Sequence, residues 1–338
     1  VAAIDCGTNT IRLLIAEADR DQMGRPRLEV LRRRNEIVRL GQGVDRTGVL
    51  DPEALERTLT VVAAYAADCA ELDVAPGAAA RRFVATSATR DARNREDFVA
   101  GVRRLLGIVP EVVSGQEEAR LSFSGSLLGA REGAGGGAQG ERAQAPRLIV
   151  DLGGGSTELV LGVDAPSAAI SLDTGSVRIT ERFLTGGVTT EAETAARAEV
   201  RGLLDGAERV VDLSAPGQLV GLAGTITTVT AHALGLQAFD PQALGGAELS
   251  PQAVLASCEA IVHSTAEQRA SWGYLAPGRR DVIAAGALVW SEVVSRVVER
   301  TTAAGRPLER VITSLYDILD GIALSLVPAQ RPAEGAGA

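Results

Sequence analysis

Short apolar runs alternate along the chain with longer stretches in which apolar residues recur every three or four positions. The first pattern predicts β-strands and the second predicts amphipathic helices, and their mixture predicts an α/β fold. The helix at 52–72 has the clearest start, because Asp51 suits the cap position and Pro52 suits the first turn. Strands are expected at 1–4, 11–16, 28–31, 36–40, 81–85, 111–113, 147–152, 158–162, 168–173, 218–222 and 310–313. Helices are expected at 52–72, 93–106, 115–128, 177–184, 191–211, 226–233, 251–263, 281–302 and 318–326.

One pattern occurs twice, once in each half of the chain. An apolar run ends in an aspartate, a Gly-rich turn with hydroxyl side chains follows, and a second apolar run begins. The two copies are Asp5–Arg12 and Asp151–Glu158. Each copy predicts a strand, a tight turn of a size that suits a phosphate group, and a second strand. Two such turns predict two similar domains that close on one phosphate chain.

The second turn carries the stronger signal for chemistry. Its three glycines let the backbone approach an anion closely, and their amides can form a concave nest for phosphate oxygens. Asp151 and Glu158 flank this turn, and two carboxylates beside a phosphate nest suit a hard divalent cation. We therefore expect both carboxylates to bind metal; the alternative is a tight β-hairpin with an incidental aspartate. The residues expected to bind phosphate here are Gly153, Gly154, Gly155 and Ser156.

The first turn has the same plan with one difference. It contains an aspartate, a glycine that allows the turn, and side chains with hydroxyl and amide donors. However, an arginine occupies the position at which the second copy has a glutamate. We therefore expect the second turn to hold the metal and the first to close on the phosphate from the other side. The alternative for the arginine is a solvated charge at a strand edge. The residues expected to contact substrate are Asp5, Gly7, Thr8, Asn9 and Arg12.

Two segments between the turns carry candidate chemistry. Ser87 and Arg90 follow a strand and precede a helix, an arrangement that suits a phosphate clamp but also occurs at ordinary helix N-caps. Glu118 lies in the first turn of the helix expected at 115–128. Ser114 and Glu117 can form the capping box of this helix, so the Glu118 carboxylate is not needed to cap it. Glu118 is therefore either a base that faces a water in the cleft or a carboxylate without a function.

Two later segments are also candidates. Gly224 and Thr225 form a strand-to-helix turn that either faces an adenosine or the far phosphates, or serves close helix packing. Arginine clusters at 32–34, 103–104 and 279–280 are either solvated faces or a path for a polyanion. The cluster of Arg279 and Arg280 is the best candidate for such a path, because it precedes an apolar helix.

Composition narrows the chemistry. The 338 residues include 34 basic residues, and all of them are arginine, which excludes a Walker-type lysine, a Schiff base and a Ser–Lys dyad. The two histidines, His232 and His263, argue against a histidine catalyst or a multi-histidine metal site. The net charge of −9 disfavours nonspecific nucleic-acid binding, although a local arginine cluster and a metal ion still allow a polyanionic substrate.

The chain is expected to be cytoplasmic. It shows no signal-peptide pattern at its start and no apolar stretch of membrane-spanning length. Three scattered cysteines, Cys6, Cys69 and Cys258, favour reduced thiols and match no zinc motif. The segment 129–146, rich in Gly, Ala and Gln, is expected to be a flexible surface loop, and 329–338 a disordered tail.

Together the motifs resemble the actin-like ATPase superfamily and, more specifically, the exopolyphosphatase/guanosine pentaphosphate phosphatase (Ppx/GppA) family. The matching segments are 5–14, 85–90, 114–119, 151–158, 278–283 and 317–321, and in order they span nearly the whole chain. The chain resembles the short, two-domain actinobacterial type, because it ends early and has too few histidines for a C-terminal His-Asp domain. The stretch 314–317 departs from the family pattern, which puts a site contact from Leu315 or Tyr316 in doubt.

The resemblance implies an actin-like fold, with two ribonuclease H-like domains around a central phosphate-binding cleft and no His-Asp domain. It implies a first domain of 1–125 plus 315–328 and a second domain of 126–314. It also implies that Mg²⁺, or another divalent cation such as Mn²⁺, supports release of orthophosphate from the end of a phosphate chain. By position, Glu118 would activate the attacking water, Asp151 and Glu158 would hold the metal, and Arg90 would help close the site.

The expected function is therefore an exopolyphosphatase that acts on inorganic polyphosphate, with guanosine pentaphosphate as a second candidate substrate. The alternatives are an actin-like ATPase or kinase, and a noncatalytic sensor of polyphosphate or an alarmone. The absence of lysine argues against the kinase, and the presence of Glu118, Asp151 and Glu158 argues against the sensor. The family resemblance leaves a homodimer open, and neither nucleic acid nor a membrane is expected as a partner.

Overall fold

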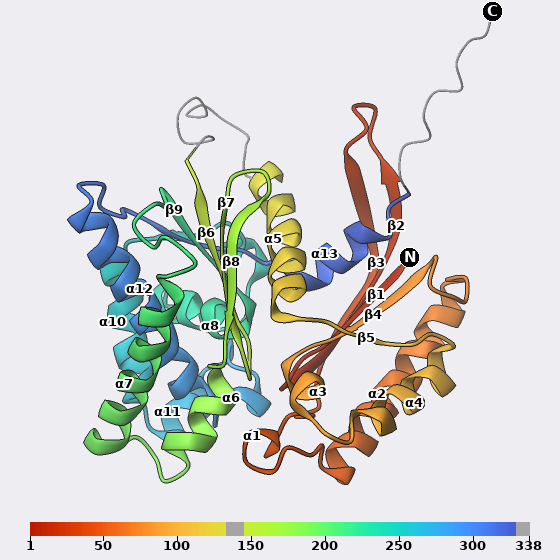
Figure 1. Ribbon diagram of the computed structural model, residues 1–338, viewed down its shortest axis with the longest axis horizontal. Coiled ribbons are helices and arrows are strands. Elements are labelled where there is room, and N and C mark those ends of the chain that lie inside the picture. Colours follow the sequence, from red (N-terminus) through yellow and green to blue (C-terminus); the bar gives the residue numbers. More distant parts are fainter. Residues whose placement is uncertain (133–144, 329–338) are drawn as a thin grey trace, which may run out of the picture.

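Two α/β domains lie side by side, with helix α5 (Gly115–Glu132) between them (Figure 1). The computed structural model describes residues 1–132 and 145–328. In the first domain the sheet order is β3 (Pro26–Ile37), β2 (Thr10–Arg20), β1 (Ala2–Cys6), β4 (Arg81–Ala85), β5 (Glu111–Val112). In the second it is β10 (Glu248–Leu249), β11 (Val311–Thr313), β9 (Gln218–Leu222), β6 (Arg147–Leu152), β7 (Thr157–Gly162), β8 (Pro166–Leu172). The expected α/β fold class is confirmed.

The repeated sequence pattern builds the same structure in both sheets. Strands β1 and β6 are apolar and buried, as central strands of a covered sheet must be. Each pairs antiparallel with the strand after its glycine turn and parallel with a later strand. The register sets Asp5 opposite Arg12 and Asp151 opposite Glu158. The first and last residues of each copy therefore meet across a strand pair.

Helices cover both faces of the first sheet. One face packs on α2 (Pro52–Glu71) and α4 (Arg95–Leu106), around Tyr65, Phe83 and Phe98. Asp51 caps α2, because its side chain accepts the amides of Glu53 and Ala54. The short helices α1 (Val44–Thr47) and α3 (Ser87–Asp91) lie on the side of the first domain that faces the second domain (Figure 1). The C-terminal helix α13 (Ile318–Ser325) covers the opposite face, where it packs on β1 and β2.

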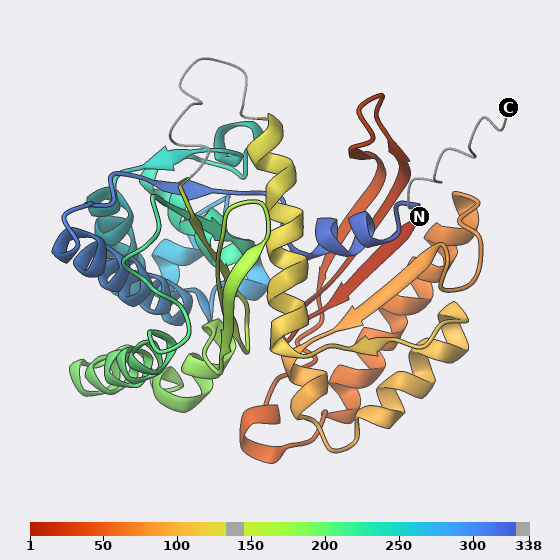
Figure 2. The same ribbon diagram turned by 45° about the horizontal axis from the view of Figure 1, so that its top comes forward.

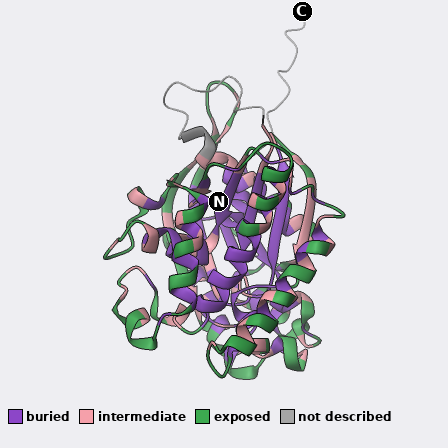
Figure 3. Cartoon of the chain, turned by 90° about the vertical axis from the view of Figure 1, so that its left-hand side faces the viewer, coloured by how far each residue is buried: buried purple, intermediate pink, exposed green. Residues whose placement is uncertain are grey.

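The second sheet is also covered on both sides. The larger core surrounds Trp290 on α12 (Ile283–Ala303), and α5 packs on the other face through Ala119 and Phe123. Figure 3 shows buried residues running through the centre, with exposed residues on the outer helix faces. The remaining helices are α6 (Ser176–Ile179), π-helical η2 (Thr180–Leu184), α7 (Thr190–Ala207), α8 (Ala223–Ala233), α9 (Pro241–Leu244), α10 (Pro251–Val262), α11 (Ala266–Ser271) and 3₁₀ helix η3 (Pro277–Arg279).

Helices α5 and α13 cross backbone to backbone between the two domains (Figure 2). A Cβ at Gly125 would lie 1.8 Å from the carbonyl oxygen of Asp317, and one at Gly321 would lie 2.0 Å from that of Leu121. Only glycine allows so close a crossing. The crossing therefore fixes the start of α13 against the helix that carries Glu118.

Most predicted elements are present, with three differences. Strand β3 is continuous over Pro26–Ile37, so the predicted break between 31 and 36 was wrong. Arginines at this edge of the sheet form ion pairs with acidic side chains of α2 and α13, which lets a charged stretch remain extended. Short helices α1, α3, α9 and α11 and strand β10 were not predicted.

The third difference concerns the predicted loop at 129–146. Helix α5 continues to Glu132, past Gly129, which packs against the ring of Tyr316. The rest of that prediction at 133–144, and the predicted tail at 329–338, lie outside the described residues. The predicted domain limit at 125/126 falls within α5 and stays a prediction. Within 1–132 and 145–328, no helix combines the length and apolar character needed to cross a membrane.

Candidate active site

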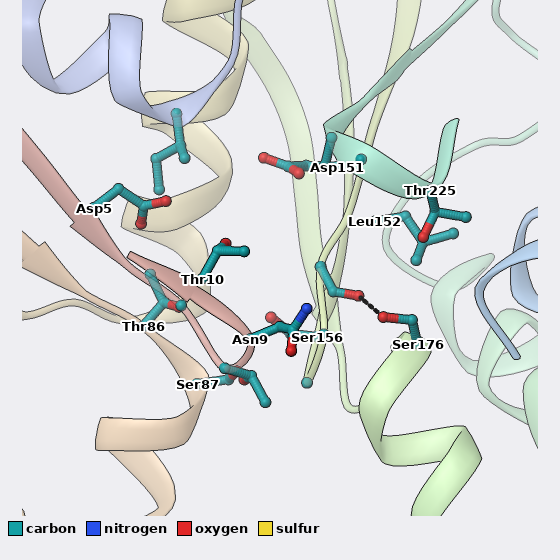
Figure 4. Close-up of a pocket in the computed structure, with 18 of the residues that line it drawn as sticks. Asp5, Asn9, Thr10, Thr86, Ser87, Asp151, Leu152, Ser156, Ser176 and Thr225 are labelled. Carbon is teal, nitrogen blue, oxygen red and sulfur yellow. Dashed lines mark hydrogen bonds between the residues drawn. The ribbon is translucent and has the colours of Figure 1, made fainter. Parts of the chain in front are cut away.

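The two glycine turns face each other across one cleft of about 760 Å³, counted with its open mouth. Figure 4 shows side chains of the first domain, such as Asp5 and Ser87, opposite Asp151 and Thr225 of the second. The cleft brings together every predicted site residue except Arg90. These are Asp5, Gly7, Thr8, Asn9, Arg12, Ser87, Glu118, Asp151, Gly153, Gly154, Gly155, Ser156, Glu158, Gly224 and Thr225.

The same hydrogen bond closes both turns. The Gly7 amide donates to the carbonyl oxygen of Thr10 at 2.9 Å, and the Gly153 amide donates to that of Ser156 at 3.0 Å. A Cβ at Gly155 would lie 2.5 Å from Thr8 Oγ1 and 2.6 Å from Ser87 Oγ. The lack of a side chain at Gly155 therefore lets the second turn touch the first domain, where the Thr8 and Ser87 hydroxyls are hydrogen bonded at 2.8 Å.

Four carboxylates on the cleft wall are buried: Asp5, Glu118, Asp151 and Glu158. Loss of solvent, followed by the nearby Asp317 charge, raises the pKa of Asp151 to about 6, although the hydrogen bond from Ser122 opposes this shift. Burial, followed by the charges of Glu118 and Asp151, raises the pKa of Glu158 well above its ordinary value. Buried carboxylates that disfavour one another's ionisation, and that offer only hard oxygen donors, fit a divalent cation.

Serine hydroxyls hold both predicted metal ligands. Ser122 Oγ donates to Asp151 Oδ2 at 2.6 Å, and Ser171 Oγ donates to Glu158 Oε1 at 2.7 Å. Neither serine was predicted, although both had a signal in the sequence. Ser122 lies one helical turn after Glu118 on α5, and Ser171 is the hairpin partner of Glu158. Such supporting hydrogen bonds orient ligands and tune metal affinity.

Glu118 lies in the first turn of α5 with its carboxylate in the cleft. Burial raises its pKa to about 8, although the Arg90 guanidinium opposes this shift. Arg90 Nη1 donates to Glu118 Oε2 at 3.2 Å and to the carbonyl oxygen of Val113 at 2.9 Å. Arg90 thus lies behind Glu118 and orients it, and a direct contact between Arg90 and phosphate stays a prediction.

Arg12 is held between two acidic residues. Its Nε donates to Asp5 Oδ2 at 3.0 Å, and its Nη1 forms an ion pair with Asp317. Only 16% of its side chain is exposed, so the solvated edge charge considered for Arg12 was wrong. Asp317 was not predicted as a site residue. Its signal in the sequence was its place at the N-cap of α13, a few residues after the last strand.

Arg279 enters the cleft over the turn at the start of α8. A Cβ at Gly224 would lie 1.0 Å from Arg279 Nη1, so the guanidinium covers that glycine. Burial lowers the pKa of Arg279 to about 10, and its side chain has no ion pair with any residue in 1–132 or 145–328. Of the pair considered as a polyanion path, Arg279 alone lines the cleft, since Arg280 bonds to the Ala270 carbonyl.

The turn at Gly224 and Thr225 lies at the cleft and is also closely packed, and its contact with an adenosine or with the far phosphates stays a prediction. It lines the cleft, and a Cβ at Gly286 of α12 would lie 2.5 Å from Thr225 Oγ1, so close helix packing also holds it. Its amides open helix α8, and the N-terminus of a helix attracts anions. Leu315 and Tyr316, whose participation was in doubt, are not among the residues that line the cleft.

Comparison with known proteins gives consistent matches along the chain. Residues 14–303 match the Ppx/GppA phosphatase family. Exopolyphosphatase 2 of Mycobacterium tuberculosis is 44% identical over 334 residues, which cover 96% of this chain and 98% of that protein. The crystal structure of an exopolyphosphatase-like protein matches with a TM-score of 0.84 and 40% identity over 96% of both chains. That of the Aquifex aeolicus Ppx/GppA family member matches with a TM-score of 0.71 and 27% identity, also over 96% of both.

Proposed function

Because this chain belongs to the Ppx/GppA phosphatase family, we propose that it is an exopolyphosphatase, which releases the terminal orthophosphate of inorganic polyphosphate by hydrolysis. One observation carries the proposal most directly. A single cleft combines two phosphate-sized glycine turns, four buried carboxylates and an arginine without an ion-pair partner in the described residues. Phosphoryl transfer depends mainly on positioning and charge neutralisation, and these groups can supply both.

Glu118 is the proposed general base. A carboxylate oxygen of Glu118 accepts a proton from the attacking water, whose oxygen bonds to the terminal phosphorus while the bridging P–O bond breaks. The shortened chain leaves with the electrons of that bond. A base works best when its pKa lies near the working pH, and the burial of Glu118 moves its pKa in that direction. Arg90 orients Glu118 through the hydrogen bond to Oε2.

Asp151 and Glu158 are the proposed metal ligands, with Mg²⁺ as the preferred ion and Mn²⁺ as a substitute. Both are buried, both carry hard oxygen donors, and a serine anchors each of them. When bound, the cation would neutralise charge on the oxygens of the terminal phosphate. The family is generally dependent on divalent metals, which supports this assignment.

The phosphate chain is proposed to lie between the two turns. Amides of Gly154 and Gly155 and the hydroxyl of Ser156 would hold the terminal phosphate. The Gly153 amide instead closes the turn, because it donates to the Ser156 carbonyl oxygen. The first turn and Ser87 would close on it from the other domain, and Arg279 with the start of α8 would meet phosphates farther along the chain. Guanosine pentaphosphate as a second substrate, a homodimer and a cytoplasmic location complete the proposal; unpaired thiols at all three cysteines suit the last of these.

Orthophosphate release in the presence of Mg²⁺ tests the function. Long polyphosphate, short polyphosphate, guanosine pentaphosphate and ATP are compared in parallel, with Glu118→Gln as the inactive control. We expect release from polyphosphate and a loss of at least about 100-fold in the control. Hydrolysis of ATP alone would favour the ATPase alternative, and tight binding of polyphosphate without release would favour a sensor.

A further inference from the structure

A single buried arginine joins the second glycine turn to the first domain. Arg178, on α6 of the second domain, donates from Nε to the carbonyl oxygen of Gly155 at 2.7 Å. Its Nη2 donates to Asp91 Oδ2 at 2.7 Å, and its Nη1 forms an ion pair with Asp45. Both aspartates belong to the first domain, where Asp45 lies on α1 and Asp91 ends α3. One guanidinium therefore bridges the two domains at the turn itself.

The bridge lies directly behind the point where the two phosphate loops meet. Gly155 touches the hydroxyls of Thr8 and Ser87, and Ser87 is the first residue of the same short helix that Asp91 ends. Arg178 thus binds the carbonyl oxygen of Gly155 in the second turn and also binds Asp91, at the C-terminal end of the helix whose first residue, Ser87, faces that turn. Separation of the domains would therefore break two sets of contacts together: those of Gly155 with the first domain and those of Arg178 with the two aspartates.

The charges make this bridge stronger than an ordinary surface ion pair. Only 10% of the Arg178 side chain is exposed, whereas Asp45 and Asp91 are 19% and 35% exposed. An arginine that loses its carboxylate partners while still partly buried is costly, and hydrogen bonds between charged groups are the strong ones. Opening would leave Arg178 with the Gly155 carbonyl alone, so the bridge favours the closed arrangement.

We propose that Arg178 is a positioning residue that couples closure of the two domains to assembly of the phosphate cradle. The coupling rests on the proposed function, because its purpose is to place Gly155 against Thr8 and Ser87 around a phosphate. Arg178 touches no reacting atom in this scheme. It acts through the Gly155 carbonyl, and its loss should weaken substrate binding more than the chemical step.

A neighbouring arginine supplies a matched control. Arg182 also crosses to the first domain, since its Nε donates to Asp45 Oδ2 at 2.6 Å, but its other partner is Glu199 in the second domain. Its hydrogen bonds go to Asp45 and Glu199 rather than to Gly155, and it is more exposed than Arg178. Arg182→Gln therefore removes an interdomain ion pair without touching the turn.

The test combines a distance measurement with kinetics. Dyes are placed at Ala63→Cys on α2 and Ala195→Cys on α7, two exposed positions on opposite domains, while the three native cysteines are buried. In Arg178→Gln we expect lower energy transfer without substrate and recovery with saturating polyphosphate. We expect KM for polyphosphate to rise about tenfold or more, with a smaller fall in kcat. Arg178→Lys should recover part of both, and Arg182→Gln should stay within about twofold of wild type.

Two further variants keep the test decisive if Arg178→Gln folds poorly. Asp45→Asn combined with Asp91→Asn breaks the bridge from the first domain and leaves the bond from Arg178 to Gly155 in place. This double variant should reproduce the lower energy transfer and the higher KM. If the double variant keeps the energy transfer and the KM of wild type, the proposal is overturned. It is also overturned if Arg178→Gln and Arg182→Gln have equal effects. If the wild-type protein releases no phosphate from polyphosphate, the proposed function fails. The energy transfer measured without substrate still tests whether the Arg178 bridge holds the two domains together.

Discussion

Glu118→Gln is the sharpest test of the proposed chemistry, because it separates the charge of the base from its shape. Glutamine has nearly the same volume, and its amide oxygen can still accept the hydrogen bond from Arg90 Nη1. It cannot accept a proton from water at neutral pH. We expect kcat to fall at least about 100-fold, the range that general-base catalysis commonly supplies, while the affinity for polyphosphate persists.

The same variant makes a prediction about stability that requires no substrate. The pKa of Glu118 rises from 4.5 to about 8 on folding, chiefly through burial. The folded state then binds this proton more tightly than the unfolded chain does. The stability that follows is fully present below pH 4.5 and is lost as the pH rises through 8. At 1.36 kcal/mol for each pKa unit, the limit is about 5 kcal/mol.

Thermal unfolding with EDTA, which removes divalent cations, measures this effect. Wild type and Glu118→Gln should be similar in Tm at pH 5, and the variant should be the more stable at pH 9, by about 5 °C or more. A Tm difference that does not change between pH 5 and pH 9 would show that Glu118 is not held in an environment that disfavours its charge. A kcat within a few-fold of wild type would remove Glu118 from the mechanism.

Three other changes test separate parts of the structure. Ser122→Ala removes the donor to Asp151 and should raise the Mg²⁺ concentration for half-maximal activity by about tenfold, measured by metal titration, with little change in Tm. Gly125→Ala should lower Tm by several degrees, because its Cβ would meet the backbone of α13 at 1.8 Å; Gly202→Ala, in an open part of α7, should leave Tm equal or higher. Arg279→Met should raise KM for polyphosphate about tenfold with a smaller effect on kcat, measured by steady-state phosphate release.

The local parts of the site could be predicted from the sequence, because short-range patterns determine them. An apolar run, an aspartate and a glycine turn specify a hairpin whose ends meet in register, so the neighbours of Asp5 and Asp151 followed from spacing alone. The capping box that left Glu118 unused was equally local. The division into two α/β domains followed from the repetition of the pattern.

The contacts between distant segments could not be predicted in this way. Arg178 lies 133 positions from Asp45 and 87 from Asp91, and no local pattern marks it as a bridge. The direction of Arg279 depends on how η3 packs over α8. The continuity of β3 depends on acidic partners from α2 and α13 that neutralise its arginines. These outcomes follow from tertiary packing and charge pairing, which the order of residues within one segment does not specify.

One difference between the two copies explains why two similar glycine turns carry different charges. Arg12 and Glu158 occupy the same register position, opposite Asp5 and Asp151. Arg12 compensates Asp5 and Asp317, so the first turn needs no added cation on its own account. The glutamate in the second copy adds a carboxylate beside Asp151 and near Glu118, so negative charge accumulates on that side. A divalent cation bound by Asp151 and Glu158 would relieve this repulsion, which supports the proposal that these two carboxylates, and not Asp5, hold the metal.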